Sequence, residues 1–168
     1  YLRRINVEAS IYIPDRFVDG YGPTSRAWSF FSDKGVKHII TMDCGATAFE
    51  ALEEGDKKGL SIGVIDHHKM GYDEPKCVGL VNPNHPDDTS NCGQLCAAGV
   101  TFLFLVRLQR LLIEQGFFQS REVADLKSLT WLVALGAVCD VVPLTGVNRL
   151  LTRHGLTIMH NEPPVPIA

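Results

Sequence analysis

Three short and almost wholly apolar segments, separated by segments of helical pattern, limit the fold of this chain most strongly. They are residues 38–42 (HIITM), 60–65 (LSIGVI) and 78–81 (VGLV), and a helical pattern at 47–58 lies between the first two. Apolar strands that alternate with helices are typical of a parallel sheet covered on both faces. We therefore predict an α/β fold with a mostly parallel sheet flanked by helices.

The remaining apolar patterns predict further helices. One is expected at residues 25–31, with Thr24 or Ser25 as its N-cap, and residues 8–13 form a short apolar run closed by Pro14. Three more helices are expected at residues 95–114, 126–138 and 148–160. The length of 168 residues suits one domain. We assign residues 1–160 to that domain and residues 161–168, rich in proline, to the start of a linker.

Composition excludes several classes of protein. No apolar run reaches the length of a membrane span, and the first ten residues lack the apolar core of a signal peptide. The five cysteines are an odd number, which indicates free thiols in a reducing compartment and a cytoplasmic location. The net charge of −3 gives no general attraction to nucleic acid, so a nucleic-acid ligand requires a local site.

Polar and titratable residues follow each predicted strand. Asp43 follows the first strand, Asp66, His67 and His68 follow the second, and Asn82 follows the third. Ligands of parallel α/β sheets bind at the carboxyl ends of the strands, so these side chains are expected at one rim. Carboxylate and imidazole groups without an evident thiolate suit Mn²⁺ or Mg²⁺.

Asp140 is the further carboxylate that we place at this rim. It lies in the apolar run WLVALGAVCDVVPL (residues 131–144), where a carboxylate is costly to bury without a partner or a metal. We predict that Asp43, His67, His68 and Asp140 converge on one pocket. Two structural alternatives stay open at this point: Asp43 could simply belong to a turn, and Asp140 could simply end a helix.

Several segments resemble a known superfamily. IDHHK after a buried strand, with TMDCG one β–α unit upstream, resembles the DHH phosphoesterase superfamily. Residues 12–24 (YIPDRFVDGYGPT) and 133–151 (VALGAVCDVVPLTGVNRLL) are similar to the RecJ family of single-strand-specific 5′-to-3′ exonucleases. So is the order VNPN, polar loop, LCAAGVTFLF. This resemblance covers essentially the whole chain and implies a metal-dependent hydrolase that acts on single-stranded DNA in repair and recombination.

The resemblance also implies a role for each site residue. Asp43 matches the carboxylate that bridges two metal ions, and His67 and Asp140 match ligands of one of these ions. Asp66 would lie behind the site and orient an imidazole, as carboxylates behind metal-bound histidines do. The expected contacts with phosphate or substrate come from His68, Asn82, Gly93 and Arg16.

The entry to the helix expected at 95–114 could also receive a phosphate. Its glycines, Gly93 to Gly99, follow the third strand, and the amino end of a helix carries partial positive charge. The alternative is that these small residues only allow close packing. The sequence leaves both interpretations open.

The chain departs from the family at both ends. The aspartate-rich first motif of the family and its strand are absent, and so are the DHHA1 and nucleic-acid-binding domains. We therefore expect part of a DHH domain that holds at most one of the two Mn²⁺ or Mg²⁺ ions and is inactive alone. Single-strand-binding protein and other repair factors are expected partners of the full-length enzyme, and no membrane is.

Two other classes of function compete with this interpretation. One is a different DHH phosphoesterase, such as a nano-RNase, a cyclic-dinucleotide phosphodiesterase or a manganese pyrophosphatase. The segments IPDRF and DVVPL argue against these enzymes. The other is a non-catalytic relative of these enzymes. Loss of Asp43, His67 or Asp140 would have supported that interpretation, but all three residues are present.

Overall fold

The computed structural model describes residues 1–161 and 163, and the chain divides into two compact units. One unit, the sheet unit, comprises residues 11–93. The other, the helical unit, comprises residues 1–10 and the chain from residue 94 onward. Among the described residues, no helix combines the length and the apolar character that crossing a membrane requires.

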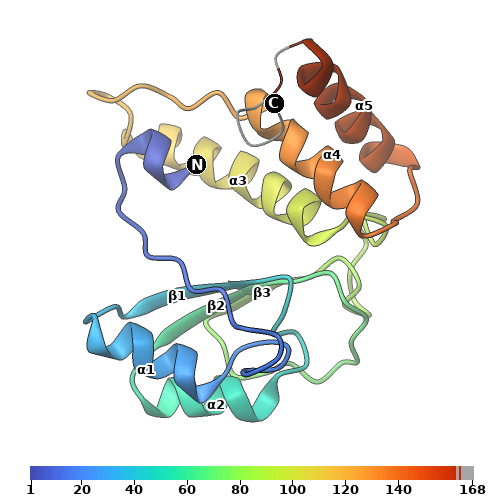
Figure 1. Ribbon diagram of the computed structural model, residues 1–168. Coiled ribbons are helices and arrows are strands. Elements are labelled where there is room, and N and C mark those ends of the chain that lie inside the picture. Colours follow the sequence, from blue (N-terminus) through green and yellow to red (C-terminus); the bar gives the residue numbers. More distant parts are fainter. Residues whose placement is uncertain (162, 164–168) are drawn as a thin grey trace. The chain divides into compact units, whose positions relative to one another are not determined.

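The sheet unit contains a three-stranded parallel sheet and two helices (Figure 1). Strands β1 (His38–Met42), β2 (Ser61–Ile65) and β3 (Gly79–Val81) lie in the order β1-β2-β3. Helices α1 (Ser25–Asp33) and α2 (Phe49–Lys57) pack on one face of this sheet. The prediction of a parallel sheet with flanking helices is therefore confirmed.

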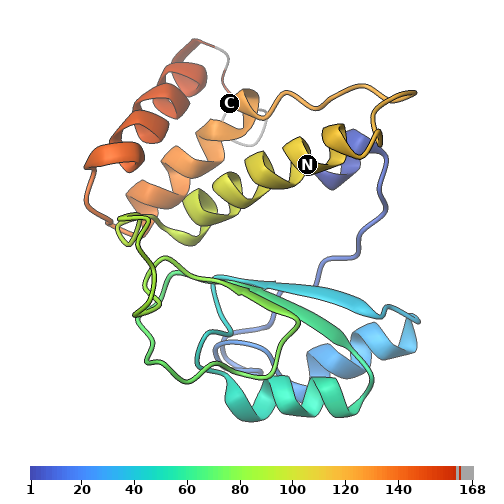
Figure 2. The ribbon, with the colours of Figure 1, turned by 180° about the vertical axis from the view of Figure 1, so that it is seen from behind.

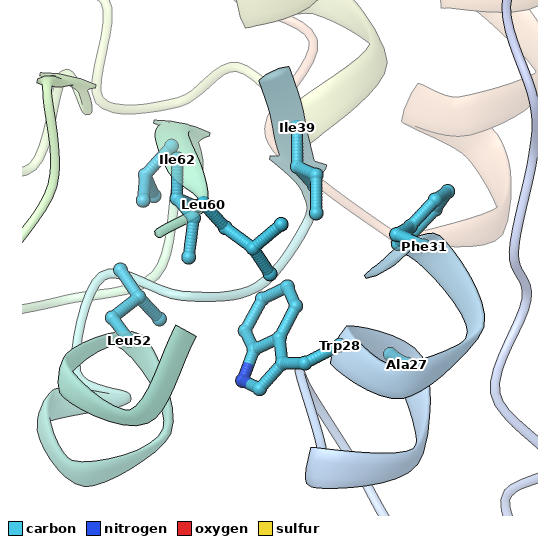
Figure 3. Close-up of a cluster of buried hydrophobic side chains, with 8 residues drawn as sticks. Ala27, Trp28, Phe31, Ile39, Leu52, Leu60 and Ile62 are labelled. Atoms are coloured by element: carbon cyan, nitrogen blue, oxygen red, sulfur yellow. The ribbon is translucent and has the colours of Figure 1, made fainter. Parts of the chain in front are cut away.

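The core of the sheet unit lies between these helices and the sheet (Figure 3). Trp28 of α1, Leu52 of α2 and Ile62 of β2 are at most 2% exposed. The indole nitrogen of Trp28 donates a hydrogen bond to the carbonyl of Ala51 at 2.8 Å, which ties α1 to α2. Burying such large side chains stabilises the unit by roughly 2 kcal/mol each.

The strand register sets the carboxyl rim of the sheet. Met42 pairs with Ile65, and Ile65 pairs with Val81, so the three strands end at the same level. The ladder continues for one more residue, because Asp43 N–H donates to the Ile65 carbonyl and Asp66 N–H donates to the Val81 carbonyl, each at 3.0 Å. Asp43 and Asp66 therefore begin their loops at the same rim.

The described part of the helical unit contains three α-helices and two short 3₁₀ turns. Its α-helices are α3 (Ala97–Glu114), α4 (Thr130–Cys139) and α5 (Gly146–Asn161), and α4 packs against both of the others (Figure 2). The 3₁₀ turns are η1 (Leu2–Ile5) and η2 (Lys127–Leu129).

Small residues let these helices approach closely. A Cβ atom at Gly136 of α4 would lie 2.9 Å from the Cβ of Ala98 in α3. A Cβ atom at Gly155 of α5 would lie 2.3 Å from the carbonyl oxygen of Thr130 in α4. Substitution of either glycine would therefore push neighbouring helices apart.

The predicted elements are present with modest shifts at their ends. The helix expected from residue 126 begins as η2 and becomes α-helical only at Thr130, and the apolar run 8–13 forms no strand. Helix α5 ends at Asn161, so the first residue of the predicted linker is helical. Of the remaining linker residues, 162 and 164–168 lie outside the described residues.

Candidate metal centre

Three side chains converge at the carboxyl rim of the sheet. Asp43, His67 and His68 each offer one ligand atom, and these atoms lie within 4.8 Å of one another. The Nε2 atom of His67 lies 3.2 Å from Oδ1 of Asp43. The Asp43 side chain is 62% exposed, whereas that of His67 is 12% exposed, so the cluster opens to solvent on the carboxylate side.

The turn after β1 gives Asp43 its position. Asp43 has a φ of 63°, in the left-handed region that aspartate tolerates better than most residues. Gly45 has a φ of 114°, and a Cβ there would lie 2.8 Å from Oγ1 of Thr41. Only glycine suits this point of the turn, which directs the N–H of Ala46 toward the carboxylate of Asp66.

Asp66 lies behind the histidines as a buried carboxylate, 2% exposed. Its Oδ2 accepts from Ala46 N–H at 2.9 Å, and its Oδ1 accepts from the N–H groups of His67 and His68 at 2.7 and 3.2 Å. Nδ1 of His68 lies 2.7 Å from the same Oδ1. Burial by itself raises the pKa of Asp66, but these hydrogen bonds outweigh it and lower that pKa below its usual value.

The ionised Asp66 fixes the ring of His68. An ionised carboxylate can only accept, so Nδ1 of His68 carries the hydrogen and Nε2 is left for a metal ion or a substrate. From the family resemblance, His68 was predicted to contact the phosphate and not the metal. The observed cluster adds His68 to the residues that could hold a metal ion.

Two asparagines after β3 hold the loop that carries the histidines. Asn82 is 6% exposed and donates to the His68 carbonyl at 2.8 Å, while Asn84 donates to the His67 carbonyl at 2.6 Å. Asn84 also donates to the Gly93 carbonyl at 3.1 Å, and a Cβ at Gly93 would lie 2.7 Å from Oδ1 of Asn84. These contacts favour a packing role for Gly93, and direct contacts of Asn82 and Gly93 with substrate stay predictions.

Tyr21 and Cys44 border the cluster without being predicted members of it. The Tyr21 hydroxyl donates to the Asp43 carbonyl and lies 3.3 Å from Nε2 of His68. Burial and the charges of Asp43 and Asp66 raise the pKa of Tyr21 to about 12. Burial and the same two carboxylates raise the pKa of Cys44 to about 11. Cys44 is thus a protonated thiol in the metal-free chain, and it is not among the three residues whose ligand atoms cluster.

Tyr21 and Asn84 were not predicted to have a role at the site. Tyr21 lies between two glycines in a loop segment, and Asn84 lies in VNPN, both of which carried the family resemblance as motifs. Arg16, the predicted substrate contact from the same loop as Tyr21, is exposed. Its charge lies near enough to Tyr21 to oppose the rise in the tyrosine pKa.

Asp140 belongs to the helical unit, and its surroundings correct one expectation. It is exposed at the C-cap of α4, so the cost of burial expected from its apolar sequence neighbours does not apply. The next residue, Val141, has a φ of 55°, and its N–H and that of Val142 bond to the carbonyls of Val138 and Ala137, each at 3.2 Å. This is the usual Schellman helix end. Convergence of Asp140 with the cluster of Asp43 stays a prediction.

The donor set of the sheet unit fits a divalent ion. One carboxylate and two imidazoles, with the nearby thiol protonated, suit a borderline ion such as Mn²⁺ better than a thiophilic one. Two of the three predicted ligands, Asp43 and His67, lie side by side. The geometry therefore supports a metal centre at the ends of β1 and β2.

Comparison with known proteins gives one family and a consistent set of relatives. The sequence pattern described as "DHH family, N-terminal domain" matches residues 1–136. The single-stranded-DNA-specific exonuclease RecJ of Dickeya dadantii is 36% identical over 152 residues, which are 89% of this chain and 26% of that protein. RecJ of Bacillus subtilis is 33% identical over 155 residues, 92% of this chain and 18% of that protein. The chain thus spans about a quarter, or less, of these relatives.

Two solved structures resemble this chain. A crystal structure of exonuclease RecJ bound to manganese matches with a TM-score of 0.72 and 28% identity, over 92% of this chain and 37% of that one. The crystal structure of RecJ in complex with Mn²⁺ from Thermus thermophilus matches with a TM-score of 0.62 and 29% identity. It covers 80% of this chain and 19% of the other.

Proposed function

This chain belongs to the DHH family, and we propose that it carries metal-binding residues of a 5′-to-3′ exonuclease specific for single-stranded DNA in repair and recombination. The observation that supports this proposal most strongly is the cluster of Asp43, His67 and His68 at the carboxyl rim of a parallel sheet. The cluster occurs in a chain that is 33–36% identical to proteins named single-stranded-DNA-specific exonucleases.

The proposed cofactor is Mn²⁺ or Mg²⁺, with two ions in the complete enzyme. Asp43, His67 and Asp140 are the proposed ligands of one ion, with Asp43 bridging to the second. A bound divalent ion lowers the pKa of a water molecule and neutralises charge on phosphate oxygens. The exposed carboxylate of Asp43 and the largely buried ring of His67 present their ligand atoms to the same point from two adjacent loops.

His68 is the proposed donor to the scissile phosphate. Asp66 accepts from Nδ1–H of this ring, so donation to phosphate would come from Nε2–H of the doubly protonated ring. A donor held in this way is already oriented when charge develops on a phosphate oxygen, so less reorganisation is needed. Arg16, Asn82 and Gly93 complete the proposed contacts with the DNA strand.

In the complete protein, residues 1–160 are proposed to form part of a DHH domain within a longer chain. Single-strand-binding protein or other repair factors are its proposed partners, and the cytoplasm is its proposed location.

Digestion of end-labelled oligonucleotides by the full-length protein tests the function. With Mn²⁺ present, we expect mononucleotides to be released from the 5′ end of a single strand and not from a blunt duplex. Chelation of the metal should abolish release. The Asp43→Asn and His67→Asn variants should lose at least about 100-fold in rate, and exposed Asp73→Asn should not.

Other products would identify another enzyme. Release from the 3′ end would contradict the proposed polarity. Cleavage restricted to dinucleotides, cyclic dinucleotides or pyrophosphate would assign the chain to a different DHH phosphoesterase. A full-length protein that cleaves none of these substrates with either metal would contradict catalysis altogether.

A further inference from the structure

The hydroxyl of Tyr21 joins two residues of the candidate metal centre. It donates a hydrogen bond to the main-chain carbonyl of Asp43 and lies 3.3 Å from Nε2 and 3.5 Å from Nδ1 of His68. The two rings meet edge to face, with centroids 5.8 Å apart and an interplanar angle of 73°. One side chain from a distant loop thus contacts the predicted bridging ligand and the predicted phosphate donor.

The loop that carries Tyr21 is braced by two aspartates. Oδ2 of Asp19 accepts from the Tyr12 hydroxyl at 3.2 Å and from Asp15 N–H at 2.9 Å, and its Oδ1 accepts from Arg26 at 3.3 Å. Oδ1 of Asp15 accepts from Phe17 N–H at 2.8 Å. These bonds tie the loop to α1 and to itself, so the position of Tyr21 does not depend on its contact with the metal centre alone.

We propose that Tyr21 is a positioning residue of the reaction, whose hydroxyl fixes the ring of His68 and the backbone of Asp43. The proposal rests on the proposed function for its effect on turnover, but its structural part can be tested without substrate.

Two groups contact the ring of His68. Oδ1 of Asp66 lies 2.7 Å from Nδ1, and the hydroxyl of Tyr21 lies 3.3 Å from Nε2 and 3.5 Å from Nδ1. Asp66 alone leaves the ring free to swing about its Nδ1 contact, because the His68 side chain is 48% exposed. The hydroxyl oxygen of Tyr21, in contact with both ring nitrogens, restricts this motion.

The bond from Tyr21 acts on the carbonyl of Asp43, a residue whose N–H is already bonded to the carbonyl of Ile65 in the sheet. Asp43 has a left-handed φ of 63°, which a non-glycine residue adopts only when its surroundings stabilise it. The hydroxyl of Tyr21 satisfies the carbonyl of Asp43 in this conformation. Loss of the hydroxyl therefore loosens the carboxylate that is proposed to bridge the metal ions.

The test compares Tyr21→Phe with the matched control Tyr72→Phe. Tyr72 is in the same unit and is 73% exposed, close to the 66% of Tyr21. Long-range ¹H–¹⁵N correlation of the histidine rings in the 168-residue chain with Mg²⁺ reports on His68 directly. Steady-state digestion of single-stranded DNA by the full-length protein with Mn²⁺ reports on turnover. Both variants keep the aromatic ring, so only the hydroxyl changes.

We expect Tyr21→Phe to shift the ring ¹⁵N signals of His68 and to lower kcat about 10-fold or more, with KM within about 2-fold of the wild type. Tyr72→Phe should change neither. Unchanged His68 signals in Tyr21→Phe would overturn the proposal, and so would an unchanged kcat. If the wild type does not digest single strands, the exonuclease function fails, while the His68 signals still decide whether Tyr21 fixes the ring.

Discussion

The carboxylate of Asp66 and the ring of His68 form a 2.7 Å contact in which the carboxylate is buried and the ring is half exposed. The same carboxylate accepts the main-chain N–H groups of both residues that follow it. One buried side chain therefore shapes the whole loop after β2. It links the end of the parallel sheet to the atoms that are proposed to bind metal and phosphate.

Replacement of Asp66 by Asn should destabilise the protein by about 3 kcal/mol. The amide group of Asn would face the N–H of Ala46 or the donors of the histidine loop, and a buried donor would be left without an acceptor. Chemical denaturation of the variant measures the change. Asp73→Asn, at an exposed carboxylate of the same unit, should stay within about 0.5 kcal/mol of the wild type. Equal stability of the two variants would contradict the role of Asp66.

The stabilisation by Asp66 should also depend on pH. Its pKa is lowered in the folded protein from the usual 3.8, because the hydrogen bonds favour the ionised form despite burial. The unfolded state therefore binds the proton first as pH falls, and the contribution is fully present above the unfolded pKa and disappears as pH falls through the folded pKa. The stability difference between wild type and Asp66→Asn should thus shrink below about pH 4. A difference that stays constant into acid would mean that the carboxylate is not ionised in the fold.

Gly45 is the position where the turn after β1 is least tolerant of a side chain. Gly45→Ala should cost about 2 kcal/mol, because its φ of 114° is strained for alanine and the new Cβ would lie 2.8 Å from Oγ1 of Thr41. Gly79→Ala in β3 is the matched control, since its Cβ would meet nothing within 4 Å. That variant should be neutral or more stable by up to about 1 kcal/mol. Thermal unfolding measures the stability of both variants. Equal losses of stability would show that the turn does not require glycine at this position.

Val141 holds an unfavourable backbone conformation directly after Asp140. A β-branched residue at a φ of 55° is strained by roughly 1–2 kcal/mol, whereas glycine adopts this conformation freely. Val141→Gly should therefore stabilise the protein by about 1 kcal/mol, net of the entropy that glycine adds to the unfolded chain. The control Val123→Gly changes an exposed valine whose φ is not positive, and it should be destabilising. A loss of stability in Val141→Gly would show that the conformation at this helix end is not strained.

The strands and the rim of the site could be predicted because their signals are local. The apolar runs predicted β1, β2 and β3. Because the strands are parallel and in register, Asp43 and Asp66 lie at one edge of the sheet. Asp43 could have belonged either to a simple turn or to a site, and in the structure it belongs to a turn and also lies beside another candidate ligand. Its left-handed backbone makes the turn, and its carboxylate lies against His67.

Other features left no local signal in the sequence. The bond of Tyr21 joins residues 22 positions apart, and a contact between a side chain and a main-chain carbonyl creates no periodic pattern. The apolar neighbours of Asp140 suggested burial, but the Schellman helix end at Val141 leaves the carboxylate exposed. In both cases the decisive factor is backbone geometry that side-chain hydropathy does not encode.

Titration calorimetry with Mn²⁺ tests the metal centre most directly, using the 168-residue chain and its Asp43→Asn and Asp73→Asn variants. We predict at most one bound ion per wild-type chain, a dissociation constant at least about 10-fold weaker in Asp43→Asn, and unchanged binding in Asp73→Asn. Two tight sites in the wild type would show that ligands outside the proposed set hold metal. Equal affinity of Asp43→Asn and the wild type would contradict a metal centre at the ends of β1 and β2.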